Sequence, residues 1–418
     1  MGEIGVGQVF ARRLTAVVAC GAVLRIVRFV FSKWNDPLLL NDSLYYSAQA
    51  QQLAHGVWFR EVFVDQPGAE HGPLTSSLMA LVSWGDDPFN RQRMVTIVCG
   101  IATIAIIGLI ARRVAGDRVA LLAAALAALY PNLWISDGLV MSESVSCLVI
   151  SLTLWALLRW TAHPTRGAAC LVGAAAGFGA LARSEVVLFV PAAALVMWLV
   201  GRRSGTRPLA HVIATTGVAL GVMLPWLIFN LVRFDEPVLL TTNEGPALLG
   251  ANCDDTYSGP AQGGWSLACL FDPATRPNED PSERSARQRH QALSYVRHHG
   301  GSVPGVVLKR VGRSFDLFAL GDMVRGDAGE EREHWASWAG IASFWLLTPL
   351  AAFGAFVTRR RDRAVLLIPV VIAVATSVMI YGGHRMRSSA EPSIVILAAI
   401  AIDHWRRRHA QGSTSPLS

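Results

Sequence analysis

The stretch MVTIVCGIATIAIIGLIA, residues 94–111, decides the fold class of this chain. It contains no charged residue, and the basic pair Arg112-Arg113 follows it directly. A helix of this length crosses most of a hydrocarbon core about 30 Å thick, because each residue adds about 1.5 Å. Backbone groups inside lipid must bond within their own segment, which favours a helix. The stretch therefore predicts a membrane-spanning helix that ends at a basic pair.

The composition of the whole chain agrees with this prediction. Of its 418 residues, 52% are hydrophobic and 16% are charged, whereas soluble domains carry about 25% charged residues. Further apolar blocks recur along the sequence at about residues 14–31, 119–135, 139–158, 168–182, 186–200, 209–226, 337–357, 364–380 and from Pro392 onward. We expect an all-α polytopic membrane protein with about ten transmembrane helices.

Positive charge marks one side of the predicted spans. Basic clusters flank the apolar blocks on alternate connections, at Arg12-Arg13, Arg112-Arg113, Arg118, Arg202-Arg203, Arg359–Arg361 and Arg406–Arg408. This is the distribution that the positive-inside rule describes. It places both termini in the cytoplasm and predicts a multi-pass protein of the plasma (inner) membrane. The net charge of +7 is then a signal of topology, and we expect no nucleic-acid partner.

The same charge pattern divides the chain into four parts. Residues 1–230 form an N-terminal transmembrane module whose first external loop is 32–90, and residues 231–334 form an extracytoplasmic loop region of mixed polarity. Residues 335–408 hold the C-terminal helices, and 409–418 a disordered tail. Amphipathic helices in the first loop are expected at the membrane interface. Cys253 and Cys269 lie in the second external region, where oxidation is permitted, and we predict a disulfide between them.

Ionisable residues gather at the outer ends of the spans. A transporter is expected to place such groups near the middle of the membrane, often in two repeated halves. Here they follow the external ends instead, at Asp42, Glu70, His71, Asp137, Glu143, Arg183, Glu185, Arg233, His384, Arg385, Arg387 and Glu391. This asymmetry favours an enzyme that works at the extracytoplasmic face.

A series of short motifs then resembles the GT-C glycosyltransferases, in the right order. Residues 41–46, Asn-Asp-Ser-Leu-Tyr-Tyr, resemble the acidic residue and Tyr-Tyr pair that open the first loop of that superfamily, and residues 70–74 resemble its His-Pro-Pro-Leu segment. Further similar landmarks are Tyr130-Pro131, Ser142-Glu143, Ala182–Glu185, Pro225–Asn230, Gly250–Asn252 and Arg385–Pro392. The branch in question includes protein O-mannosyltransferases and aminoarabinose transferases. Two departures are a single acid beside Asn41 and Phe229 in place of an arginine.

The resemblance implies an inverting sugar transfer from a polyprenyl-phosphate donor to an envelope lipid, glycan or protein at the extracytoplasmic face. Such a reaction needs a base for the acceptor hydroxyl and cations for the leaving phosphate. Asp42 is the matched position for the base. The alternative is that Asp42 only caps the helix that begins there, because Asp and Asn are common N-caps.

The resemblance and the outer-face placement give the remaining candidates. Asp137 is a second catalytic candidate, which would orient the acceptor or bind a cation; alternatively it is a turn residue. Arg385 and Arg387 are suited to hold a phosphate, since arginine makes bidentate contacts to it, or they reach the membrane interface only. The substrate-binding candidates are Tyr45, Tyr46, Glu70, His71, Glu143, Arg183, His384, Arg385 and Arg387.

The cofactor and two other functions stay open at this point. The histidines make no recognised zinc spacing, so the metal is unknown; Mg²⁺ or Mn²⁺ is possible but has no ligand motif. The first rival function is a transporter or flippase of lipid-linked glycans. The second is a non-catalytic assembly subunit that keeps a GT-C fold.

Overall fold

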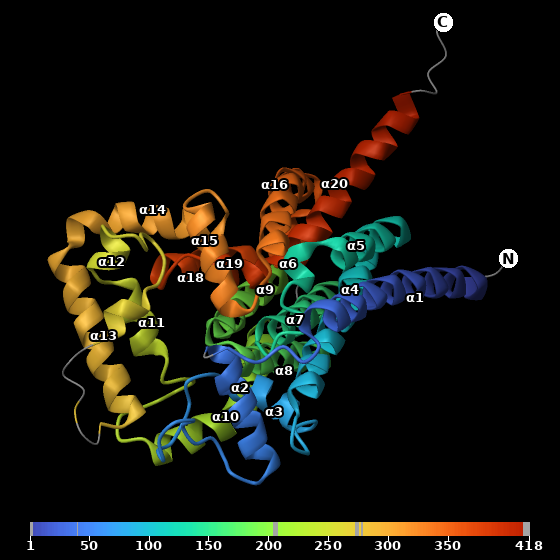
Figure 1. The fold of residues 1–418 in the computed structure, drawn as a ribbon. Helices are drawn as coiled ribbons and strands as arrows, with labels where there is room; N and C mark the ends of the chain where they lie inside the picture. Colours follow the sequence, from blue (N-terminus) through green and yellow to red (C-terminus); the bar gives the residue numbers. More distant parts are fainter. Residues whose placement is uncertain (1–2, 40, 204–207, 272–275, 277–278, 413–418) are drawn as a thin grey trace, which may run out of the picture.

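The computed structural model describes residues 3–39, 41–203, 208–271, 276 and 279–412. Over these residues the chain is helical and has no strand; its one β-bridge pairs Arg60 with Pro67. Figure 1 shows a bundle of long helices with a group of shorter helices on one side. We call the side that carries these shorter helices the outer side.

Seven helices of the described residues are long and apolar enough to cross a membrane. These candidate spans are Gly7–Lys33, Phe89–Ala115, Glu143–Ala162, Ser184–Arg203, Pro208–Arg233, His334–Val357 and Arg360–Met379. They contain α1 (Glu3–Arg28), α4 (Phe89–Ala115), α7 (Glu143–Ala162), α9 (Phe189–Arg203), α10 (Pro208–Arg233), α16 (His334–Val357), α17 (Arg360–Leu366) and α18 (Ile368–Met379). The predicted all-α polytopic membrane fold is confirmed.

Helices also occupy the three other positions where spans were expected. These are α5 (Asp117–Leu129), followed by the short α6 (Pro131–Trp134), α8 (Arg166–Ala182) and α20 (Glu391–Gly412). The first half of α20 is buried from Ile394 to Ala401, because it packs between α5 and α16. Residues 409–412, expected in the disordered tail, continue this helix; the rest of that tail lies outside the described residues.

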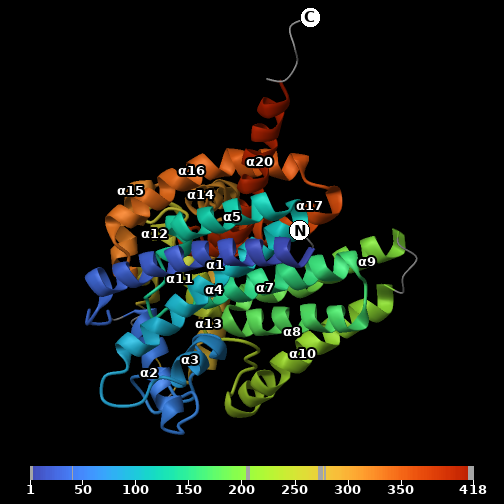
Figure 2. The ribbon, with the colours of Figure 1, turned by 90° about the vertical axis from the view of Figure 1, so that its right-hand side faces the viewer.

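Small residues set how closely the long helices pack. A Cβ atom at Gly173 of α8 would lie 2.2 Å from the backbone oxygen of Thr215 in α10, and one at Gly354 of α16 would lie 1.9 Å from that of Leu397 in α20. Only glycine permits these backbone approaches, as is common between membrane helices. Figure 2 shows α7, α8, α9 and α10 running alongside one another.

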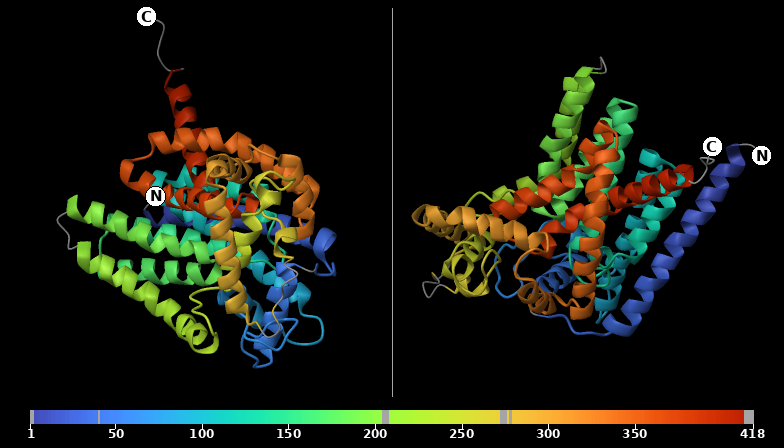
Figure 3. Two further views of the ribbon diagram at one scale, coloured as in Figure 1. Left: turned by 90° about the vertical axis from the view of Figure 1, so that its left-hand side faces the viewer. Right: turned by 90° about the horizontal axis from the view of Figure 1, so that it is seen from above.

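The outer side is built from the two long external regions. The first gives α2 (Asp42–Ala54) and α3 (Pro73–Ala80), and the second gives α11 (Glu244–Ala251), α12 (Asp254–Tyr257), α13 (Pro281–His298), α14 (Val303–Ser314) and α15 (Leu320–Asp327). Short α19 (His384–Arg387) joins α18 to α20. In Figure 3, α13 and α14 project away from the bundle, opposite the start of α1 and the end of α20.

A disulfide joins Cys253 to Cys269 and closes the disulfide loop, residues 253–269. This loop supports the connection that leads into α19, because the Gly382 N–H donates to the Gly263 carbonyl oxygen at 2.9 Å. A Cβ at Gly382 would lie 2.0 Å from the carbonyl oxygen of Arg310 in α14. The path into α19 is therefore fixed by the disulfide loop and α14 together.

Candidate active site

A pocket of about 630 Å³ opens on the outer side of the bundle. Its polar wall comes from α2, the segment before α3 and α19, and includes Asp42, Glu70, His71 and Arg385. Other parts of the lining come from the segment after α10 and from α11, α13 and α18. Its apolar residues include Val187, Leu188, Val238, Leu239, Met379 and Ile380. The pocket thus joins an apolar surface to a cluster of charged groups.

Asn41, and not Asp42, caps helix α2. The Asn41 side chain accepts a hydrogen bond from the Ser43 N–H at 2.8 Å, and its own amide donates to the Gly329 carbonyl oxygen at 2.6 Å. This is the usual work of an N-cap residue. The carboxylate of Asp42 is consequently free of the helix end and lies in the pocket wall. The alternative that Asp42 serves only as a cap is wrong.

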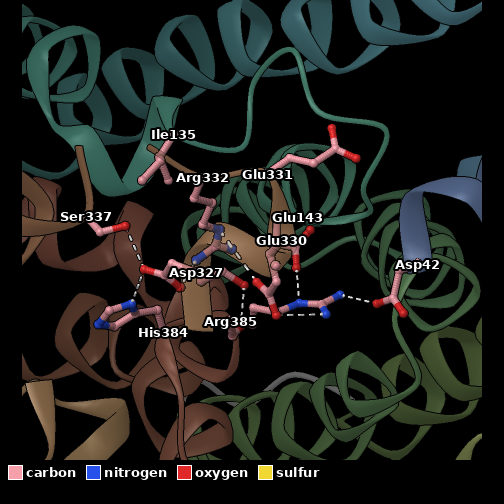
Figure 4. A network of polar contacts seen from close by, with 12 residues as sticks. Asp42, Ile135, Glu143, Asp327, Glu330, Glu331, Arg332, Ser337, His384 and Arg385 are labelled. Atoms are coloured by element: carbon pink, nitrogen blue, oxygen red, sulfur yellow. Dashed lines mark hydrogen bonds and ion pairs between the residues drawn. The ribbon is translucent and has the colours of Figure 1, made fainter. Parts of the chain in front are cut away.

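Arg385 lies at the centre of the charged cluster, between three carboxylates (Figure 4). Its Nη2 donates to Asp42 Oδ2 at 2.7 Å, its Nε to Glu143 Oε1 at 2.6 Å and its Nη1 to Glu330 Oε1 at 3.2 Å. These partners come from α2, α7 and the connection that follows α15. One guanidinium therefore holds together the first external loop, a span and the second external region.

The charge on Asp42 follows from these contacts. Burial raises the pKa of Asp42, but the guanidinium of Arg385 and the ring of His71 outweigh it and hold the pKa well below its usual range. Nearby cations stabilise a carboxylate anion in this way. Asp42 is therefore ionised at neutral pH. Its Oδ1 has the longer contact, 3.4 Å from His71 Nε2.

His71 is held in place by the two tyrosines of α2. Its ring stacks on Tyr46 with centroids 4.6 Å apart and meets the edge of Tyr45 at 5.2 Å. The Tyr45 hydroxyl accepts a hydrogen bond from the backbone N–H of Glu70 at 2.9 Å. Burial lowers the pKa of His71, yet Asp42 raises it above its ordinary value of 6.5. The tyrosines thus orient the segment that brings Glu70 and His71 to Asp42.

Asp42, Glu70 and His71 also form a group that could hold a metal ion, since their ligand atoms lie within 4.8 Å of one another. Two carboxylates and an imidazole suit a divalent cation, and the buried Nε2 of His71 makes no hydrogen bond. These observations fit a metal. A second such group is Asp235, Asp280 and Glu283. There Asp280 already caps α13, because it accepts from the Glu283 N–H at 2.8 Å.

Arg183 and Glu143 extend the cluster away from Arg385. Glu143 Oε1 accepts from Arg183 Nη1 at 3.1 Å, and Arg183 Nε donates to Glu185 Oε1 at 2.5 Å. Arg183 lines the pocket, whereas Glu143 lies behind it, 2% exposed. Burial lowers the pKa of Arg183, but the carboxylates around it raise the pKa beyond its usual range. Arg183 therefore presents a permanent positive charge to the pocket.

Five predicted site residues lie outside the pocket lining, and three of them, Asp137, His384 and Arg387, have their ionic partners away from the pocket. Asp137 is buried against Arg25, whose Nε lies 2.6 Å from Asp137 Oδ2, and it accepts from the Ser144 hydroxyl at 2.6 Å. Arg387 is buried between Asp316 and Glu391, at 2.7 and 2.6 Å. His384 bonds Asp316 and Asp327. The structure therefore brings together Asp42, Tyr46, Glu70, His71, Arg183 and Arg385, with Tyr45 and Glu143 directly behind them.

The sequence reasoning missed the acidic stretch before α16. Glu330 binds Arg385, and the next residue, Glu331, accepts from the Ser43 hydroxyl at 2.5 Å, beside Asp42. Arg93 of α4 lies 3.4 Å from Glu331. The available signal was the dense charge of Asp-Ala-Gly-Glu-Glu-Arg-Glu, residues 327–333, directly ahead of a span. Tyr381, which lines the pocket near Arg385, carried no comparable signal.

Comparisons with known proteins show a partial family match and a shared fold. The family model described as dolichyl-phosphate-mannose-protein mannosyltransferase matches residues 70–229. No curated protein sequence is significantly similar to the chain. Among solved structures, the apo oligosaccharyltransferase of Archaeoglobus fulgidus is similar with a TM-score of 0.59 and 16% identity, covering 98% of this chain and 53% of that one.

Two further structures are similar as well. AglB, the archaeal oligosaccharyltransferase from Archaeoglobus fulgidus in complex with an inhibitory peptide and a dolichol-phosphate, has a TM-score of 0.57 and 15% identity, covering 97% of this chain and 52% of that one. ArnT from Cupriavidus metallidurans bound to undecaprenyl phosphate has a TM-score of 0.46 and 17% identity, covering 96% and 79%.

This chain spans about half the length of the archaeal chains, of which 52% and 53% are covered. Within the chain itself, the match is nearly complete. The chain is therefore similar to the mannosyltransferase family over residues 70–229 and shares the fold of the archaeal oligosaccharyltransferases.

Proposed function

We propose that this protein transfers a sugar from a polyprenyl-phosphate donor to an acceptor at the extracytoplasmic face of the plasma membrane. The observation that carries the proposal is the contact between the Asp42 carboxylate and Arg385 in a pocket whose lining also includes apolar residues. A lipid-linked sugar phosphate needs both environments, an apolar surface for the chain and cations for the phosphate. The membrane fold is consistent with a donor that stays in the lipid.

The pocket suggests where each part of the donor lies. The polyprenyl chain packs on the apolar wall around Val238, Leu239 and Met379. The phosphate lies near Arg183 and Arg385, since guanidinium groups hold phosphate by charge-assisted hydrogen bonds. Every guanidinium nitrogen of Arg385 already contacts a carboxylate. These contacts use three of its five N–H donors. The donor phosphate can bind the remaining donors or displace a carboxylate, and the contact to Glu330, at 3.2 Å, is the longest.

Asp42 is the base in this proposal. The acceptor oxygen forms a bond to the anomeric carbon, the bond from that carbon to the phosphate oxygen breaks, and the polyprenyl phosphate leaves with the bonding electrons. The acceptor proton passes to Asp42. One direct displacement of this kind inverts the anomeric centre. Arg183 and Arg385 offset the charge that develops on the leaving phosphate, as preorganised donors do in transfer reactions.

A divalent cation such as Mg²⁺ or Mn²⁺ would be held by Asp42, Glu70 and His71, whose ligand atoms lie within 4.8 Å. When bound, it would supply further positive charge for the phosphate. His71 and Glu70 also orient the acceptor side of the pocket through Tyr45 and Tyr46.

The acceptor is an envelope lipid, glycan or protein. The family description names a protein mannosyltransferase and one similar structure contains an inhibitory peptide and a dolichol-phosphate, which supports this donor class and leaves a protein acceptor among the candidates. The pocket extends to Glu244 and Arg289 of α11 and α13, whose exposed ion pair measures 3.1 Å. We propose that the acceptor enters between these helices.

The test is sugar transfer by the purified, membrane-reconstituted protein. Radiolabelled polyprenyl-phosphate hexoses and pentoses are offered in turn with envelope extracts as acceptor, with and without Mg²⁺. We expect one donor to be consumed and its sugar to appear on the acceptor with inverted anomeric configuration. Movement of the intact donor across the bilayer without bond cleavage would contradict the proposal and favour a flippase.

A further inference from the structure

The short helix α19 carries Arg385 between two anchoring residues. His384 Nε2 lies 2.8 Å from Asp316 Oδ1, and Arg387 Nη1 donates to Asp316 Oδ2 at 2.7 Å. Asp316 itself is fully buried. One carboxylate therefore fixes α19 at both of its ends, while Arg385 between them extends to the pocket.

His384 holds a second carboxylate with its other nitrogen. Its Nδ1 lies 3.0 Å from Oδ2 of Asp327, which also accepts from the Ser337 hydroxyl at 2.6 Å. Figure 4 shows His384 on the far side of Arg385 from Asp42. Because His384 is not among the residues that line the pocket, it does not touch the substrate.

A chain of alternating charges leads from Asp327 back to Arg385. Arg332 Nη1 lies 3.6 Å from Asp327 Oδ1, and Arg332 Nε lies 3.7 Å from Glu330 Oε2. The other oxygen of Glu330 accepts from Arg385. His384 is thus connected to Arg385 twice, once through the backbone of α19 and once through Asp327, Arg332 and Glu330 (Figure 4).

Both ring nitrogens of His384 lie near carboxylate oxygens: Nδ1 is hydrogen-bonded to Asp327 Oδ2, and Nε2 lies 2.8 Å from Asp316 Oδ1 as an ion pair without hydrogen-bond geometry. Only the imidazolium carries a proton on both nitrogens. A neutral ring would turn a lone pair towards one of these oxygens. The charged groups around the ring are Asp316 from the connection after α14, Asp327 from α15, Arg387 beside Asp316 and Arg332 beside Asp327. Burial lowers the pKa of His384, but its two carboxylate partners raise the pKa to about 9.

We propose that His384, as an imidazolium, is a positioning residue for sugar transfer: it locks α19 so that Arg385 stays between Asp42, Glu143 and Glu330, and loss of its proton releases that lock. The proposal rests on the proposed function, because Arg385 matters only if the pocket carries out transfer. It makes the transfer rate depend on the protonation of His384, which the roles of Asp42 and Arg385 do not include.

The sign of the pH dependence follows from the raised pKa. A group whose pKa is higher in the folded state contributes its full stabilisation below its ordinary value, here 6.5, and loses it as the pH rises through about 9. Transfer and thermal stability should therefore both decline on the alkaline side. His384→Gln removes the titrating group, so both profiles should become flat there.

The experiment compares His384→Gln with His298→Gln, a matched change at an exposed histidine that ends α13. Transfer is measured from about pH 7 to about pH 10. We expect His384→Gln to be about tenfold slower at neutral pH, the effect of losing charge-assisted hydrogen bonds, and to lack the alkaline decline. His298→Gln should match the wild type at every pH.

A charge-balanced variant keeps the test from depending on folding alone. In His384→Gln, Asp327 keeps Arg332 but loses a cation; adding Asp327→Asn removes the excess negative charge. The double variant should recover most of the lost rate and still show no alkaline decline. If His384→Gln transfers at the wild-type rate with the wild-type pH profile, the proposal is overturned.

Thermal unfolding of the same variants, which needs no donor, separates this proposal from the proposed function. A wild type that transfers no sugar defeats the proposed function and with it the positioning role. In that case the ionic lock alone is still tested. It predicts that the wild type loses stability through about pH 9, and that His384→Gln does not. Identical unfolding profiles for the two proteins contradict the lock.

Discussion

Two aspartate–arginine pairs of similar length serve different ends in this protein. Asp42 meets Arg385 at 2.7 Å and Asp137 meets Arg25 at 2.6 Å. The side chains of the first pair are 27% and 17% exposed, and those of the second are both 1% exposed. The first pair lies in a pocket wall, where a substrate can exchange with one partner. The second has no such access and joins α1 to the connection between α6 and α7.

The surroundings of the two arginines explain this difference. Among the residues that the structure describes, Asp137 is the one ionic partner of Arg25. Its other hydrogen bonds go to backbone oxygens of Gly21, Ala127 and Ala128. Arg385 holds three carboxylates at once. Three carboxylates around one guanidinium carry a net negative charge. Such a group can bind another cation, or one carboxylate can leave while the arginine keeps the other two. A one-to-one buried pair does neither, and we infer that it stabilises the fold.

The largest effect is expected from removing the cation of the pocket. Arg385→Ala leaves Asp42, Glu143 and Glu330 without their shared partner and removes a donor from the phosphate, so transfer should fall about 100- to 1,000-fold. Arg385→Lys keeps the charge but cannot contact three carboxylates in fixed directions. Its transfer rate should lie between those of the wild type and Arg385→Ala. Transfer rates per folded protein measure both. Wild-type activity in Arg385→Ala would show that Arg385 has no role in the reaction.

The next effect is on stability rather than activity. Asp137→Asn leaves Arg25 buried without a counter-ion, and breaking such a pair costs about 3–5 kcal/mol. We expect a large loss of thermal stability in detergent, with the transfer rate per folded molecule close to that of the wild type. The pair variant Arg25→Met with Asp137→Leu should be more stable than Asp137→Asn alone. A large fall in the transfer rate per folded molecule of Asp137→Asn would instead indicate that Asp137 is a catalytic residue.

The smallest effect is expected from substituting Asn41, which caps α2 in place of Asp42. Asn41→Ala removes the cap of α2 and its contact to Gly329; loss of a cap costs about 1 kcal/mol. Transfer should fall only a few-fold, by loosening Asp42. Asn41→Ser can still cap the helix and should stay close to the wild type. Equal losses in the two variants would mean that capping is not what matters at this position.

The sequence predicted the class of this fold well, because apolar runs such as residues 94–111 and the basic pairs beside them follow from the bilayer itself. It also placed Asp42, Glu70, His71, Arg183 and Arg385 on the outer side, and the structure brings these residues to one pocket. The helical, polytopic membrane architecture is confirmed, and the predicted resemblance agrees with a family match over residues 70–229 and with the fold shared with an archaeal oligosaccharyltransferase. These are properties that local sequence and length encode.

Partners across the chain could not be predicted in the same way. Nothing local distinguishes Asp137 from Asp42, since each stands near the outer end of a span; only tertiary packing puts Arg25 against the one and a pocket beside the other. The same holds for Glu330, which lies far from Arg385 in the sequence. His384 precedes Arg385 directly and Arg387 follows two residues later, yet both contact Asp316.

The most direct test of the central claim compares Asp42→Asn with Asp137→Asn in one transfer assay, with thermal unfolding measured on the same samples. Asparagine keeps the shape of each side chain and removes its charge. The account predicts that Asp42→Asn transfers sugar at least about 100-fold more slowly, as expected for a lost general base, and that its thermal stability stays closer to wild type than that of Asp137→Asn. Undiminished transfer by folded Asp42→Asn would contradict the account.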